Sequence, residues 1–151
     1  MRAKAAEPLA AERVDPAERR LAVALRLGGS LLLLAFGAVL LPTQSMTATH
    51  RWLTMGEFPE SPLADYLTRS ISLLYGIKGG MYWVLATDVR RYAPVIRYVG
   101  WTTIGFGVLM VAIDYRAGMP LFWTLSEGPP IAAIGMLFLL LLRRVDAVGR
   151  A

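Results

Sequence analysis

Ionisable residues lie inside or at the ends of apolar stretches of this sequence, where few neighbours can balance a charge. Those best placed to form a polar or ligand-binding site are Asp65, Arg69, Asp114 and Glu127. An unpartnered charge at the centre of a bilayer costs roughly 3 kcal/mol or more, so such residues usually face a protein interior and pair with one another. The sequence therefore predicts a polar site built from opposite charges.

Within this group, we predict that Arg69 pairs with Glu127. On helices that start near positions 62 and 120, both residues lie seven positions inside the helix, which is about 10 Å along its axis. Asp65, one helical turn before Arg69, is the competing partner. Two interpretations remain open for the pair: a structural clamp between helices, or a site that contacts a substrate, a proton or a quinone.

The helix that carries Arg69 has further features on its faces. Gly76 and Gly80 share the face of Arg69 and would let another helix approach closely. Lys78, a secondary candidate for the site, lies on the opposite face near Tyr82. We expect Lys78 either to extend toward the membrane surface, to pair with an acid, or to contact a partner protein.

Glu127 is followed by Gly128, Pro129 and Pro130. Because proline lacks a backbone donor and crowds the preceding turn, this sequence predicts an interruption of the helix. A carboxylate beside such an interruption is a candidate for binding. The sequence contains no metal-ligand spacing, so we predict no metal site and no cofactor.

Four apolar stretches must hold these residues in place. They lie at about 21–42, 62–86, 95–113 and 120–142. Each approaches the 20 residues that cross a hydrocarbon core about 30 Å thick as a helix. The predicted fold class is therefore all-α, a polytopic integral membrane four-helix bundle. A polar tail (1–20) precedes the four-span domain (21–142), and a second tail (143–151) follows it.

Composition agrees with a membrane protein and excludes several kinds of chemistry. Hydrophobic residues make up 56% of the chain and charged residues 18%. The chain has no cysteine and one histidine, which excludes thiol chemistry and a bis-histidine haem within the chain. The loops are too short for a soluble catalytic domain. A non-enzymatic protein is favoured over an enzyme that uses Glu127 as an acid or base.

The cations are distributed unevenly around the four stretches. With the N-terminus inside, the cytoplasmic side would carry Arg2, Lys4, Arg13, Arg19, Arg20, Arg26, Arg90, Arg91, Arg97, Arg143, Arg144 and Arg150. The other side would carry Arg51 and Arg116. Cytoplasmic loops of membrane proteins are enriched in Lys and Arg, so both termini are predicted to be cytoplasmic, in a bacterial inner membrane. The net charge of +5 then indicates contact with anionic lipids rather than nucleic acid.

The plan of four spans, the RSISLLYGIKGG run at 69–80 and the polar residue early in the fourth span together resemble small bacterial membrane proteins of the DoxX-like type. The resemblance covers about 120 residues. Some members of that group look like subunits or partners of quinone-linked oxidoreductases. The resemblance therefore implies membrane redox work by association with another protein.

Two functions follow from these observations. The first is an accessory or structural subunit of a membrane complex, with membrane lipids and a membrane protein as partners. The alternative is a carrier, or a quinone- or lipid-binding protein, with an outward-facing polar pocket around Arg69 and Glu127. The surroundings of Glu127 distinguish them, because binding requires a cavity that reaches both residues.

Overall fold

The computed structural model describes residues 15–53, 56–59 and 61–149, and this part of the chain is all-α, as predicted. Its helices are α1 (Pro16–Phe36), α2 (Thr43–Trp52), α3 (Pro62–Leu85), α4 (Ala93–Arg116) and α5 (Leu121–Val148). A 3-10 turn, Gly37–Val39, extends α1. Helices α1, α3, α4 and α5 correspond to the four predicted stretches. The short helix α2 lies in the first connection.

Local sequence explains where two of these helices begin. Asp15 precedes α1 and accepts a hydrogen bond from the backbone nitrogen of Ala17, at 2.8 Å. Ser61 does the same for α3, where its hydroxyl accepts from the nitrogens of Leu63 and Ala64. In both helices proline follows the capping residue, a position where its missing N–H is not needed. Because α1 begins at Pro16, the predicted tail 1–20 is partly helical; its first 14 residues lie outside the described part.

The turn between α4 and α5 reverses the chain within a few residues. Gly118 has a positive φ of 69°, and the nitrogen of Met119 donates to the carbonyl oxygen of Asp114 at 3.0 Å. This pattern is the Schellman motif, which satisfies the last carbonyls of a helix and favours glycine at the left-handed position. Pro120 follows and caps α5. The turn therefore places α5 antiparallel to α4.

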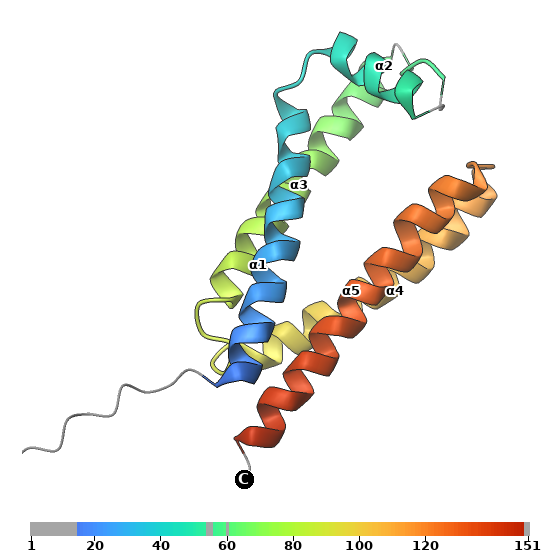
Figure 1. Ribbon diagram of the computed structural model, residues 1–151. Helices are drawn as coiled ribbons and strands as arrows, with labels where there is room; N and C mark the ends of the chain where they lie inside the picture. Colours follow the sequence, from blue (N-terminus) through green and yellow to red (C-terminus); the bar gives the residue numbers. More distant parts are fainter. Residues whose placement is uncertain (1–14, 54–55, 60, 150–151) are drawn as a thin grey trace, which may run out of the picture.

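The helices form two antiparallel hairpins that meet at one end and diverge toward the other (Figure 1). One hairpin consists of α1 and α3, the other of α4 and α5. We call the end where they meet the vertex and the other the open end. Helix α1 begins and α5 ends at the vertex, whereas α2 and the α4–α5 turn lie at the open end. The two termini of the helical region therefore lie on the same side.

The hydrophobic core lies at the vertex, where all four long helices contribute to it. Its buried members include Leu21, Leu25, Tyr82, Leu85, Ile96, Val99, Phe138 and Leu142. The rings of Tyr82 and Phe138 meet edge to face, with centroids 5.5 Å apart. Beyond this core the helices expose many large apolar side chains, among them Leu34, Leu74, Leu109 and Leu140.

Close helix packing within each hairpin depends on glycine. A Cβ on Gly79 would lie 2.7 Å from the carbonyl oxygen of Gly29, and a Cβ on Gly107 would lie 2.6 Å from that of Gly128. Such contacts let two backbones approach without side chains between them. The predicted close approach at Gly76 is confirmed, since Gly76 packs on Phe36. The same prediction for Gly80 is wrong, because nothing lies within 4 Å of a Cβ on Gly80. The closely packed residue is its neighbour Gly79.

Two described helices are long and apolar enough to cross a membrane by length and composition. They are α1 with its 3-10 extension (Pro16–Val39, mean hydropathy 1.9) and α4 (Ala93–Arg116, mean hydropathy 1.5). Only 11% and 28% of their most apolar windows are buried inside the protein. Of the four spans that the sequence predicted, only two are matched by described helices that pass this test.

Candidate functional site

Arg69 holds the end of α1 against α3. Its Nε donates to both carboxylate oxygens of Asp65, at 3.0 and 2.9 Å. Its two terminal nitrogens donate to the carbonyl oxygens of Val39, at 2.6 Å, and Leu41, at 3.2 Å. These carbonyls belong to the segment where α1 and its 3-10 turn end, so no following helical turn supplies donors. The planar guanidinium satisfies three groups at once through three separate nitrogens, a spacing that the single ammonium nitrogen of a lysine cannot reproduce.

The predicted ion pair between Arg69 and Glu127 is absent from the ion pairs of the described residues, and Arg69 pairs instead with Asp65. The cause is the register of the helices. The hydroxyls of Tyr82 and Thr103 are 3.2 Å apart, which aligns α3 with α4. From there the Gly107–Gly128 contact places Glu127 near the level of Tyr75. Arg69 lies six residues beyond Tyr75, about 9 Å farther toward the open end.

Glu127 lies on the second hairpin, with Asp114 and Trp123 as neighbours. Asp114 is 3% exposed, and its Oδ2 atom has no hydrogen-bond partner among the described residues. No lysine or arginine of the described chain lies within ion-pair distance of either carboxylate. The side chain of Glu127 is also within electrostatic range of Tyr75 on α3. Glu127 therefore belongs to the side of α5 that is directed toward the first hairpin.

The predicted interruption at Pro129 and Pro130 is also absent, because α5 continues through both prolines. Their missing N–H groups leave the carbonyls four residues earlier, at Leu125 and Ser126, without the usual helical partner. The glycine contact with α4 at Gly128 supports this part of the helix from the side. The carboxylate of Glu127 is thus presented by an intact helix.

Lys78 lies between the two hairpins, close to the vertex. Its Nζ is 5.9 Å from the ring centre of Tyr82 and 5.7 Å from that of Phe106 on α4. The predicted neighbourhood of Lys78 and Tyr82 is therefore confirmed. Aromatic faces attract cations, but they do not neutralise the charge as a carboxylate would. Within the described chain, Lys78 takes part in no ion pair.

The four predicted site residues thus divide into two pairs on different hairpins: Asp65 with Arg69, and Asp114 with Glu127. A cavity of about 350 Å³ at the open end, between α2 and the start of α3, is lined by Asp65 but does not include Arg69, Asp114 or Glu127. No group of three or more possible metal ligands occurs among the described residues.

Sequence reasoning named Lys78 and its neighbour Tyr82, but it did not predict that they lie, with Tyr75, on the face of α3 that meets the second hairpin. Tyr75, Lys78 and Tyr82 follow one another at helical spacing along the face of α3 that is directed toward the second hairpin. Thr103 on α4 completes the contact through its hydrogen bond with Tyr82. The spacing was visible in the sequence, but only the fold shows that this face meets α4.

Comparisons with protein-family models, with curated proteins and with solved structures found no match. The function proposed below is therefore argued from the chain's own residues.

Proposed function

We propose that this chain is an integral membrane protein whose four long helices cross a bacterial inner membrane and which serves as an accessory subunit of a membrane complex. The supporting observation is the low burial of its most apolar helices. A core helix of a soluble protein would be mostly buried, whereas the windows in α1 and α4 are only 11% and 28% buried. Apolar surface on this scale needs a lipid or protein environment.

The distribution of cations supports an orientation with both termini in the cytoplasm. Exposed arginines gather near the vertex, at Arg19, Arg20, Arg26, Arg90, Arg91, Arg97, Arg143 and Arg144. The open end carries Arg51 and Arg116. The positive-inside rule then assigns the vertex to the cytoplasmic side. In this orientation the hairpins diverge toward the outer leaflet.

Unpaired charges between the hairpins support the role of a subunit. Lys78 and Glu127 lie on surfaces that the two hairpins direct toward each other, and neither forms an ion pair within the described chain. At this depth lipid tails cannot balance a charge, which costs roughly 3 kcal/mol or more. A transmembrane helix of another protein, carrying polar residues of its own, would balance both charges.

The resemblance to DoxX-like proteins stays a prediction. It agrees with a role for this chain as a subunit that associates with a membrane redox enzyme. The alternative of a carrier or quinone-binding protein has less support. It needs an outward pocket that joins Arg69 to Glu127, but the guanidinium of Arg69 is engaged by Asp65 and the cavity at the open end does not reach Glu127.

Site-specific cross-linking tests the proposed contact. A photo-crosslinking residue at position 75 would face the space between the hairpins, whereas the same residue at position 66 replaces a tyrosine that is 65% exposed near the open end. We expect one membrane protein to be cross-linked from position 75 in native membranes and to co-purify in stoichiometric amount. Lys78→Met should reduce both signals at least fivefold.

Arg116→Gln is the matched control, because it also removes one positive charge, but an exposed one at the open end. It should leave the cross-link and co-purification unchanged. Size-exclusion profiles must agree among all variants, so that a loss of partner is separated from a loss of fold. Equal capture by the wild type and Lys78→Met, or no stoichiometric partner from native membranes, would contradict the proposal.

A further inference from the structure

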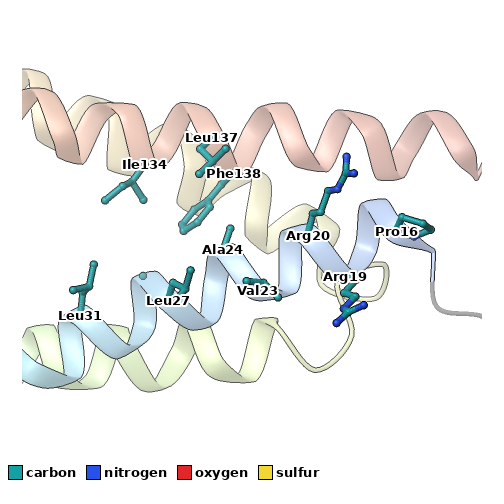
Figure 2. Close-up of a pocket in the computed structure, with 11 residues that line it drawn as sticks. Pro16, Arg19, Arg20, Val23, Ala24, Leu27, Leu31, Ile134, Leu137 and Phe138 are labelled. Carbon is teal, nitrogen blue, oxygen red and sulfur yellow. The ribbon is translucent and has the colours of Figure 1, made fainter.

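A groove of about 640 Å³ runs between α1 and α5, away from the predicted polar site. Its walls are apolar and come from both hairpins, with Val23, Leu27 and Leu31 on α1 and Ile134, Leu137 and Phe138 on α5. Figure 2 shows Leu31, Ile134 and Phe138 projecting into the space between the two helices. Leu27 and Leu31 are 63% and 61% exposed, so the protein does not fill the groove with its own side chains.

The end of the groove nearest the vertex is basic. Arg19 and Arg20 both line it, and Arg20 extends across the space toward α5, whereas Arg19 is directed to the other side of α1 (Figure 2). The neighbouring acids Asp15 and Glu18 are both engaged by Arg90. Among the described residues, Arg19 and Arg20 therefore have no ion-pair partner. The mouth of the groove carries positive charge that the described chain does not balance.

The length of the groove matches one leaflet of a bilayer. From Arg20 to Leu31 is eleven residues of α1, or about 16 Å of helix. Half of a hydrocarbon core about 30 Å thick is about 15 Å. A chain anchored by a headgroup at Arg20 would thus lie along Leu27 and reach Leu31 near the middle of the membrane.

We propose that this groove binds one anionic phospholipid of the cytoplasmic leaflet, with its phosphate at Arg20, the positive charge of Arg19 nearby, and an acyl chain between α1 and α5. Arginine provides two parallel donors that suit phosphate oxygens. The apolar walls exclude an occupant that is polar along its length, and the unbalanced charge at one end favours an anionic amphiphile. The proposal rests on membrane insertion, but not on the identity of any protein partner.

The test uses the full chain in nanodiscs that contain equal amounts of phosphatidylglycerol and phosphatidylcholine. After mild release, native mass spectrometry measures which lipid remains bound. We expect one phosphatidylglycerol per chain, enriched over phosphatidylcholine. Each cation near a membrane surface contributes about a fivefold preference for anionic lipid, so Arg19→Gln with Arg20→Gln should lower the enrichment at least fivefold.

Two controls separate a built site from general surface charge. Arg143→Gln with Arg144→Gln removes the same charge near the vertex, but neither residue lines the groove. It should keep the enrichment. Leu27→Trp fills the groove and should release the lipid, whereas Leu34→Trp, outside the groove, should not.

Equal losses in both arginine double variants would overturn the proposal in favour of diffuse electrostatic attraction. Retention of phosphatidylcholine equal to that of phosphatidylglycerol would overturn the proposed selectivity for an anionic headgroup. A peptide that co-purifies in the groove would overturn the proposal that the occupant is a lipid. If the chain does not enter nanodiscs at all, both the proposed membrane insertion and the proposed lipid site are contradicted. Loss of a protein partner alone would leave the lipid result intact.

Discussion

At the scale of single residues, Arg69 is a clamp rather than a member of a binding site. The sequence identified Arg69 as paired and Asp65 as its competing partner, because spacing of four residues is readable from a helix. It did not identify the carbonyls of Val39 and Leu41. Those acceptors become available only because α1 ends before Pro42 and the chain folds back over α3. Long-range backbone contacts of this kind have no signature in side-chain spacing.

Replacing Arg69 tests this role. Arg69→Lys keeps the charge but replaces the three nitrogens of the planar guanidinium with one ammonium nitrogen, so it cannot reproduce the spacing of the contacts with Asp65 and both carbonyls. We expect the melting temperature in detergent to fall by a few degrees, with partner capture from position 75 unchanged. A variant that melts like the wild type but loses its partner would instead make Arg69 part of a functional contact.

At the scale of helices, close packing depends on which glycine faces the neighbouring backbone. The sequence indicated a glycine-mediated approach but assigned it to Gly76 and Gly80. The crossing of α1 over α3 selects Gly79 instead, opposite Gly29. Four-residue spacing alone cannot decide this, because the crossing angle determines which residues meet. The continuity of α5 through Pro129 and Pro130 was missed for a similar reason, since the supporting contact comes from α4.

Neighbouring glycines on α3 therefore provide a matched comparison. Gly79→Ala places a Cβ 2.7 Å from the carbonyl oxygen of Gly29, and backbone cannot move aside easily. Overpacking of this kind costs about 1–3 kcal/mol. Gly80→Ala meets nothing within 4 Å and should stabilise the helix by up to about 1 kcal/mol. In detergent, the melting temperature of Gly79→Ala should fall below that of the wild type, and that of Gly80→Ala should rise above it. Shifts of the same sign would contradict the packing described.

At the scale of the whole molecule, the all-α fold and the four long helices could be predicted from the apolar stretches. The divergence of the two hairpins could not. It follows from where the core side chains gather, since Leu21, Leu85, Ile96 and Leu142 all pack at the vertex. Lys78 on the first hairpin and Glu127 on the second both lack an ion-pair partner within the described chain.

Cysteine labelling tests the central claim, that four helices cross the membrane with the vertex inside. The natural chain has no cysteine, so single substitutions report one position each. Thr87→Cys lies in the connection at the vertex, and Ala117→Cys lies in the exposed turn at the open end. Leu34→Cys, within α1, should stay unlabelled in intact membranes.

We predict that a membrane-impermeant maleimide labels Ala117→Cys on intact spheroplasts, and labels Thr87→Cys only after the membrane is opened. Labelling of both positions from outside, or release of the protein from membranes by alkaline carbonate, would contradict the account.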